Sequence, residues 1–167
     1  MKKKPELTSE SQVLEPYKEI IAKYDDSQKV EWIDWSGRLP KRIFKVSNLL
    51  VELAEKAKNW QYLNYLFIIL SAAVPVIVTV LIEVLKLPYI ASVLDLVFPA
   101  AVGVMEKISL NASQERDALI AVKSPYETLL SNVIVDIYQK TYSAKREIYE
   151  GRWDKLDTIL ANAKIPV

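Results

Sequence analysis

The sequence contains no cysteine and no histidine, and only three of its 167 residues are glycine. Without cysteine the chain forms no disulfide, and without histidine it lacks the usual proton shuttle and the commonest zinc ligand. Three scattered glycines cannot build a glycine-rich phosphate loop or a dinucleotide fingerprint. These absences exclude most enzyme classes, so we expect a protein that is not an enzyme and that holds no cofactor.

Two pairs of acidic residues are candidate metal ligands. Asp25 adjoins Asp26, and Glu52 lies three residues before Glu55. Either pair could hold a divalent cation in principle. Paired acids are nevertheless common on solvated helices, where they bind nothing. We therefore predict no metal site.

An excess of charge of one sign is also lacking. Lysine and arginine number 22 against 21 aspartates and glutamates, which gives a formal net charge of +1. No global field draws such a chain to nucleic acid, which we do not expect as a partner. A local basic cluster, Lys2 to Lys4 with Arg38, Lys41, Arg42 and Lys45, could contact anionic lipid head groups or an anionic regulator, or could simply be solvated.

Apolar residues, by contrast, are abundant and concentrated in two segments. Hydrophobic residues make up 51% of the chain, yet no residue from Trp60 to Ile82 is charged, a run of 23 positions. A helix needs roughly 20 residues to cross a hydrocarbon core about 30 Å thick. After the turn "EVLKLP", the segment from Tyr89 to Met105 is apolar except for Asp95. The pattern predicts a tight transmembrane hairpin.

The alternative is a soluble helical protein that buries both apolar helices as its core. A chain this short has too little remaining sequence to wrap two such helices on every side. We therefore predict an all-α membrane protein, a two-helix transmembrane hairpin whose N- and C-terminal cytoplasmic helices form a helical bundle. The predicted regions are an N-terminal cytoplasmic region with one short helix (1–39), a pre-membrane helix (40–59), a first span (60–83), a turn (84–88), a second span (89–106) and C-terminal cytoplasmic helices (107–167).

The basic residues predict the orientation of the hairpin. Twelve of the 22 precede Trp60, Lys86 lies in the turn, and nine follow Met105. By the positive-inside rule both termini lie in the cytoplasm, which fits a multi-pass protein of the inner (plasma) membrane. The start "MKKKPELTSESQVLEP" is positive but has no apolar run after it, so we expect no secretory signal peptide. Aromatic residues are placed as interfacial anchors at the two ends of the hairpin: Trp60, Tyr62 and Tyr65 at one end and Tyr89 at the other.

Polar residues inside the hairpin require an explanation, because an aspartate at the centre of a span costs about 2.5–3.5 kcal/mol on insertion scales. Asp95 should therefore face protein or water. Pro99 cannot donate to the carbonyl of Asp95, four residues earlier, and Pro75 stands in the same relation to Ser71. Our hypothesis is that these two kinked sites form the polar, adjustable part of an oligomeric channel. Asp95 and Glu83 would then favour cations.

A second interpretation of Asp95 stays open. Its side chain could hydrogen-bond within a packed helix bundle, to Ser92 or to a neighbouring subunit, and line no pore. Small residues would let helices approach closely and so favour association in lipid: these are Ala72, Ala73, Ala91, Ala100, Ala101 and Gly103. We expect a homo-oligomer in a lipid bilayer.

Several helices are expected outside the hairpin. A helix that begins at Pro40 should continue into the first span. Its apolar positions alternate spacings of three and four, a heptad seam that serves assembly or, alternatively, folds against its own chain: these are Ile43, Val46, Leu50, Leu53, Ala57 and Trp60. "SPYE" from Ser124 predicts a helix start with a capping box, and Gly151 predicts its end.

Three shorter segments complete the expected pattern. "RWDKLDTILANAK" predicts a short amphipathic helix with Leu156, Ile159 and Leu160 facing inward. "EPYKEIIAKYDD" predicts another short helix that begins at Glu15 or Pro16. "DWSGRLP" predicts a loop, because it combines serine, glycine and proline.

The order of "ELAEKAKNWQYLNYLFIILSAAVPVIVTVL", a short turn, a second apolar helix and "NASQERDALIAVKSPYETLLSNVIVDIY" resembles the SLATT domains. These are two-transmembrane effectors associated with bacterial nucleotide-sensing and reverse-transcriptase defence systems. The similarity covers roughly Phe44 to Tyr138 and includes an "AEKA" helix that enters an "ILSAAVP"-like span. Many members carry an aromatic and arginine element after the second span, whereas here "SLNASQERDAL" offers only Arg116. The resemblance implies a membrane pore that kills or arrests an infected cell, with cytoplasmic helices that receive a signal from a partner protein or a nucleotide.

These observations lead to two functional hypotheses of different classes. The first is a homo-oligomeric pore-forming effector that acts in antiviral defence by membrane disruption, as in abortive infection. The alternative is a non-conducting membrane anchor or scaffold that presents its helical bundle to a partner protein. A holin-like lesion former is disfavoured, because the cytoplasmic portion is large and patterned.

Overall fold

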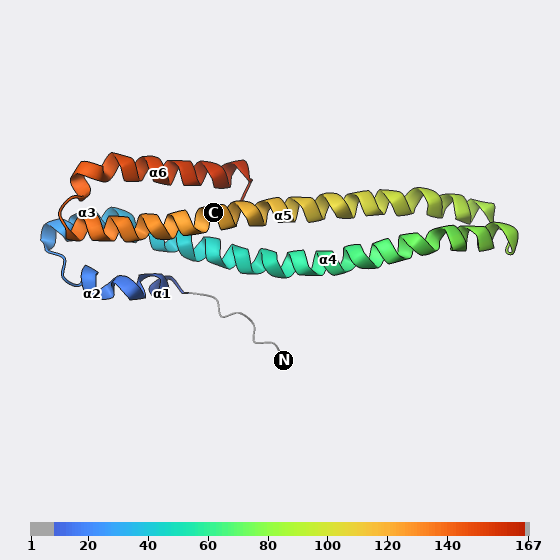
Figure 1. Cartoon of the computed structure of the whole chain (residues 1–167), viewed down its shortest axis with the longest axis horizontal. Helices are drawn as coiled ribbons and strands as arrows, with labels where there is room; N and C mark the ends of the chain where they lie inside the picture. The colour runs from blue at the N-terminus through green and yellow to red at the C-terminus, as the bar shows by residue number, and fades with distance from the viewer. Residues whose placement is uncertain (1–8, 166–167) are drawn as a thin grey trace. The chain divides into compact units, whose positions relative to one another are not determined.

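The computed structural model describes residues 9–165, except for the side chains of Ala91 and Asp95. Within these residues the chain is helical and contains no strand, which confirms the all-α expectation. Figure 1 shows the order of the elements along the chain. They are α1 (Glu10–Leu14), the 3-10 helix η1 (Glu15–Tyr17), α2 (Lys18–Ile21), α3 (Asp26–Ser36), α4 (Leu39–Glu83), α5 (Pro88–Tyr138) and α6 (Tyr142–Asn162).

Two compact units divide this chain. The first, here called the bundle unit, consists of the described residues 9–53 and 115–165. The second, here called the hairpin unit, runs from Ala54 to Gln114. Because the bundle unit is built from both ends of the described chain, the hairpin unit is an insertion within it.

Helix α4 begins one residue before the predicted start at Pro40 and continues to Glu83 without a break. The first positions of the predicted heptad seam, Ile43 and Val46, are 3% and 0% exposed and belong to the hydrophobic core of the bundle unit. Leu50 and Leu53 pack against that core. This part of the seam therefore folds against its own chain, the second of the two interpretations.

Helix α5 runs from Pro88 through Ser124 and Pro125 to Tyr138, so the helix start predicted at "SPYE" is wrong. A proline at position 125 removes the donor to the carbonyl of Ala121. Both residues are exposed, so water can satisfy that carbonyl. An apolar stripe on α5 continues past the proline at spacings of three and four and holds the helix together: it comprises Leu119, Val122, Tyr126, Leu129, Val133 and Ile137, each at most 2% exposed.

The break that was predicted at Gly151 lies instead between Tyr138 and Tyr142, and Gly151 is an exposed position within α6. Lys140 adopts a left-handed conformation with φ 59°, and the Thr141 amide donates to the Asp136 carbonyl at 2.9 Å. This is the geometry of a helix C-terminus that usually carries glycine.

Buried residues on one face of α6 keep this helix continuous at Gly151. They are Tyr149, Trp153, Leu156 and Leu160. Of the three inward positions predicted in the last segment, Leu156 and Leu160 are buried, whereas Ile159 is 41% exposed.

The predicted loop from Asp34 to Pro40 is present only at its centre, since Gly37 and Arg38 alone separate α3 from α4. Trp35 is fully buried, and its contacts override the local signal of serine, glycine and proline. The short helix predicted from Glu15 or Pro16 is present as η1 and α2, whereas α1 was not anticipated.

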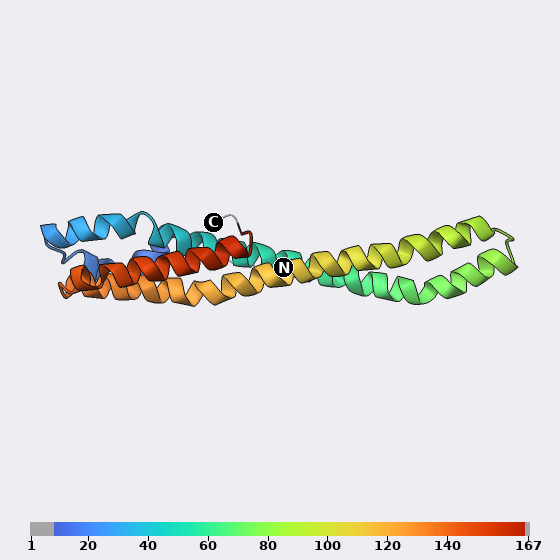
Figure 2. The same cartoon turned by 90° about the horizontal axis from the view of Figure 1, so that it is seen from above.

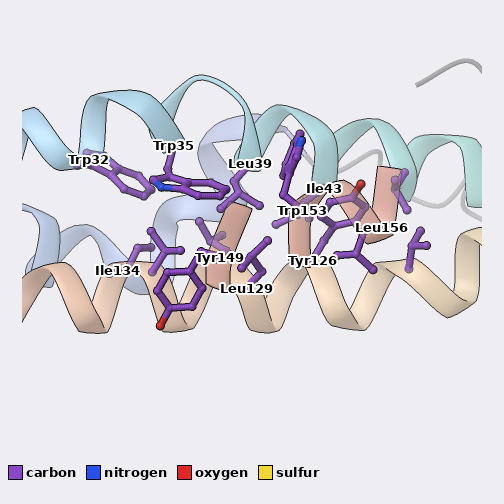
Figure 3. Close-up of a cluster of buried hydrophobic side chains, with 14 of the residues drawn as sticks. Trp32, Trp35, Leu39, Ile43, Tyr126, Leu129, Ile134, Tyr149, Trp153 and Leu156 are labelled. Carbon is purple, nitrogen blue, oxygen red and sulfur yellow. The ribbon is translucent and has the colours of Figure 1, made fainter. Parts of the chain in front are cut away.

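The core of the bundle unit joins helices from both ends of the chain (Figure 3). The Trp153 ring of α6 lies edge-on to Trp35 of α3 and to Tyr126 of α5, with ring centroids 6.1 and 5.4 Å apart. Trp35 Nε1 donates to the Tyr142 hydroxyl at 2.6 Å, and the Tyr24 hydroxyl donates to the Ile134 carbonyl at 2.8 Å. The buried polar atoms of these aromatic side chains are therefore satisfied.

The hairpin unit has almost no core of its own. Its helical parts, from α4 and α5, lie side by side in Figures 1 and 2, and the rings of Phe67 and Phe98 meet at 5.9 Å. Among its described side chains only Val74 is buried. Both helices are long and apolar enough to cross a membrane, and 6% and 0% of their apolar 18-residue windows are buried within the structure. The helices are therefore not enclosed by this chain as the core of a soluble protein would be.

A buried leucine of α5 beside this stripe provides a test of the core. Leu130 is 2% exposed, so Leu130→Ala should destabilise the bundle unit by about 2–5 kcal/mol, through lost burial and a residual cavity. Ile120→Ala, at a site 55% exposed on the same helix, should change stability by less than about 0.5 kcal/mol. Thermal unfolding of the full chain in detergent micelles, followed by tryptophan fluorescence, measures both. Equal unfolding midpoints for the two variants would contradict this description of the core.

Candidate functional site

The predicted pore residues lie on the two helices of the hairpin unit. Ser71 and Pro75 are inside α4, Glu83 is its exposed last residue, and Pro99 is an exposed position inside α5. The backbone of Asp95 is helical, but its side chain lies outside the described set. Whether these residues line a pore stays a prediction.

Three hydroxyl groups of the hairpin unit bond within their own helices. Ser71 Oγ donates to the Ile68 carbonyl at 2.7 Å. Thr79 Oγ1 donates to the Pro75 carbonyl at 2.9 Å. Ser92, the expected neighbour of Asp95, donates to the Pro88 carbonyl at 3.0 Å. Bonds of this kind satisfy a hydroxyl in an apolar medium without a partner helix.

Asn64 is a polar residue of the hairpin that the sequence reasoning missed. Its Oδ1 atom is buried and has no hydrogen-bond partner among the described residues. An unsatisfied buried acceptor costs about 1–3 kcal/mol, so this amide is a place where water or another polar group would be favourable. The available signal was an amide inside the uncharged run from Trp60 to Ile82.

The predicted interfacial aromatics are accessible on the hairpin unit. Tyr62 and Tyr65 are both 66% exposed, Tyr89 is 88% exposed, and Trp60 is half-buried. Large exposed aromatic rings with a polar edge suit a membrane–water boundary. Their role as anchors stays a prediction.

A polar cluster in the bundle unit, around Asp136 of α5, was also missed. This carboxylate is 7% exposed, and it accepts from Lys145 Nζ at 2.9 Å on both oxygens, from Thr141 Oγ1 at 2.9 Å, and from the Tyr149 hydroxyl. Burial alone would raise the pKa of Asp136, but the hydrogen bonds from Tyr149, Lys145 and Thr141 outweigh it, so the pKa lies below its usual range.

The hydrogen bond between Tyr149 and Asp136 has the opposite effect on the pKa of its donor, Tyr149. Burial, and then the bond to Asp136, raise the pKa of Tyr149 well above its ordinary value. The donors to Asp136 lie in α6 and in the connection before it, so this carboxylate of α5 holds the two helices together. The contacts were invisible in the sequence, because they depend on where α6 turns back.

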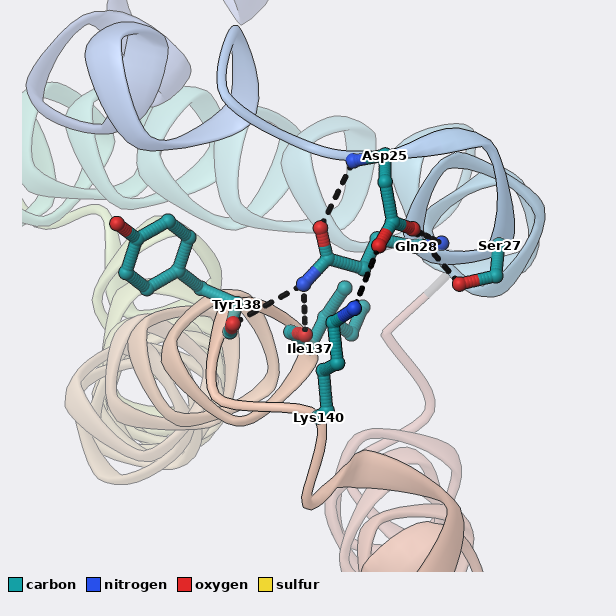
Figure 4. Close-up of polar contacts among 6 residues, drawn as sticks. All are labelled: Asp25, Ser27, Gln28, Ile137, Tyr138 and Lys140. Carbon is teal, nitrogen blue, oxygen red and sulfur yellow. Dashed lines mark hydrogen bonds and ion pairs between the residues drawn. The ribbon is translucent and has the colours of Figure 1, made fainter.

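Asp25, one of the acids considered as a metal ligand, is committed to other partners (Figure 4). Its carboxylate pairs with Lys140 at 2.7 Å and accepts from Ser27 Oγ at 2.7 Å and from the backbone N–H of Gln28 at 2.9 Å. These bonds, that from Lys140 above all, lower the pKa of Asp25. No cluster of three or more acids occurs within residues 9–165 that could hold a metal ion.

Gln28 completes this contact between α3 and the end of α5. Its Nε2 donates to the carbonyls of Ile137 at 2.9 Å and Tyr138 at 3.0 Å. The last carbonyls of a helix have no partner within it, and here a side chain from a distant segment supplies the donor. The contact therefore joins the start of α3 to the end of α5.

Comparisons with known proteins add no family to these observations. No protein-family model matches the chain, and no curated protein or solved structure matches it.

The Asp136 cluster predicts a pH dependence. A carboxylate whose pKa is lowered by folding contributes stability above its unfolded pKa of about 3.9, and that stability is lost as the pH falls through the folded value. At pH 7, Asp136→Asn should therefore destabilise the bundle unit by about 1–3 kcal/mol. The difference in unfolding free energy between the wild type and this variant should become smaller below about pH 4.

The measurement is the unfolding midpoint of the full chain in detergent between pH 3 and pH 7. Asp154→Asn, a substitution at an exposed position of α6, is the matched control and should follow the wild type throughout. A gap between the wild type and Asp136→Asn that stays constant with pH would show that the carboxylate charge contributes nothing.

Proposed function

We propose that this protein is a multi-pass protein of the inner membrane that assembles as a homo-oligomer and forms a pore. In this proposal the hairpin unit spans the bilayer twice and the bundle unit lies in the cytoplasm with both termini. The resemblance of residues 44–138 to SLATT domains supports a role as an effector in antiviral defence, in which membrane disruption arrests an infected cell.

The supporting observation is the bare apolar surface of the hairpin unit. Its two apolar windows are 6% and 0% buried, and Val74 alone of its described side chains is buried. In water such a surface would cost about 25 cal/mol for each Å² left exposed. Lipid removes most of that cost, and contact with further copies removes the rest where small residues let helices approach.

A non-conducting membrane anchor is the second candidate, and one observation favours it. The hydroxyl groups of Ser71, Thr79 and Ser92 donate hydrogen bonds to carbonyls of their own helices. Hydroxyls bonded in this way do not need to line a watery path. In that case the bundle unit, which carries the large core, would present its surface to a partner protein.

Expression in bacteria separates the two candidates. A pore should float with vesicles in a density gradient and collapse the membrane potential, reported by a potential-sensitive dye. A control in which a flexible linker replaces the hairpin unit, residues 54–114, keeps both parts of the bundle unit and should do neither. Flotation of the full chain with an unchanged membrane potential at high expression would favour the anchor, and a full chain that stays monodisperse in buffer without detergent would exclude both.

Ion selectivity tests the predicted role of Asp95. If its carboxylate faces the conducting path, Asp95→Asn should reduce the preference for cations, because a ring of negative charge attracts them. Reversal potentials of the purified protein in planar bilayers, under a salt gradient, measure the change. Asp154→Asn makes the same change of charge outside the apolar windows and should leave the reversal potential unaltered. Unchanged selectivity in Asp95→Asn would remove this residue from the path.

A further inference from the structure

Four cations converge on one pocket of the bundle unit, at the junction between α3 and α4. The pocket has a volume of about 350 Å³, and its lining contains no acid. The lining residues are Gly37, Arg38, Lys41, Arg42, Lys45 and Trp153. The four cations follow the i, i+3, i+4, i+7 spacing, which brings their side chains to one side of a helix.

Without a bound ligand, this grouping of four cations destabilises the folded chain. Like charges three or four residues apart on a helix repel each other, and cations near a helix N-terminus oppose its dipole. The first turn of α4 carries no acid that would offset either effect. A bound anion would turn both unfavourable interactions into favourable ones, because the N-terminus and the cations attract the same charge.

The two arginines are held in position and still have donors to offer. Arg38 donates to Glu150 at 2.5 Å and lies 3.9 Å from the centroid of the Trp35 ring. Its Nε is buried and has no hydrogen-bond partner among the described residues. Arg42 donates to Asp157 at 2.9 Å. Each guanidinium has five N–H donors, so one carboxylate does not exhaust it.

The lysines carry the charge that is left over. Lys41 and Lys45 are exposed, and no carboxylate in residues 9–165 forms a salt bridge with either. Glu150 and Asp157 neutralise the two arginines, so the pocket keeps two positive charges. A ligand with at least two negative charges therefore matches it.

We propose that this pocket binds a phosphate-bearing anion. Guanidinium groups match the geometry of phosphate oxygens, and lysine adds point charge. The Trp153 ring is 8% exposed and already lies against Arg38 and Arg42, each 5.3 Å from its centroid, so no face is left for a stacked base. Recognition is thus of the phosphate groups themselves, and this binding goes beyond the proposed pore and does not require conduction.

The phosphate could come from a soluble molecule or from a lipid head group, and two probes distinguish these sources. Inorganic pyrophosphate is titrated into the full chain in detergent micelles, with heat and tryptophan fluorescence as readouts. In the second arm the chain binds vesicles of phosphatidylcholine with and without phosphatidylinositol bisphosphate. Binding of pyrophosphate supports a soluble ligand, and a requirement for the phosphoinositide without pyrophosphate binding supports a head group.

Two matched pairs of variants assign the binding to the pocket. The double variant Lys41→Gln, Lys45→Gln should weaken binding by about tenfold or more. The double variant Lys23→Gln, Lys155→Gln removes the same charge at exposed positions outside the pocket lining and should bind as the wild type does.

Gly37 provides the second pair. Its φ is −85°, and a Cβ added there meets nothing within 4 Å, so a side chain fits without strain. Gly37→Glu places a competing carboxylate at the pocket and should abolish binding, whereas Gly37→Gln, of nearly the same size, should retain most of it.

Two outcomes would overturn the proposal. One is the absence of binding to both probes by a folded wild-type chain. The other is an equal weakening by both lysine double variants, which would indicate attraction to the general surface charge. Loss of binding in the pocket variants alone, with their unfolding midpoints unchanged, supports the proposal whether or not the protein conducts.

Discussion

The bundle unit depends on the burial of a single apolar stripe along the C-terminal part of α5. Helices α3, α4 and α6 each contribute buried side chains to the core that contains this stripe, and Trp153 connects Trp35 to Tyr126 within it. Burial of this stripe keeps α5 helical through Pro125 and keeps α6 helical through Gly151. The polar contacts of Asp136, Gln28 and Asp25 then set where α5 ends and how the neighbouring segments meet it.

The hydrophobic residues of the two units are placed in different ways. In the bundle unit, apolar faces meet each other and leave charged faces to water. In the hairpin unit, the apolar residues face outward on almost every side, and only lipid or other protein can cover them. This contrast explains how one chain can be 51% hydrophobic and 26% charged. The charged residues cover the bundle unit, and the exposed apolar residues are concentrated on the hairpin unit.

The sequence predicted the features that follow from long periodic patterns. These are the all-helical class, the continuous helix from Pro40 into the apolar segment, and the inward positions Ile43, Val46 and Leu156. It failed where local turn signals competed with burial elsewhere. Packing removed the helix boundaries predicted at "SPYE" and at Gly151, and it shortened the loop predicted at "DWSGRLP" to Gly37 and Arg38. The basic residues of the pocket were recognised as a cluster, but their convergence with Trp153 was not, because that contact joins residues more than 100 positions apart.

The insertion of the hairpin within the bundle unit has a consequence for the order in which the protein is made. Trp35 bonds to Tyr142 across 107 residues, and Arg38 bonds to Glu150 across 112. A ribosome therefore releases the N-terminal helices long before their partners exist. The hairpin unit emerges in between and can enter a bilayer first. During that time the N-terminal helices lack the partners in α5 and α6 that they contact in the finished bundle unit. Completion of the bundle is thus a late event in synthesis, and until then the buried tryptophans of α3 are available to chaperones.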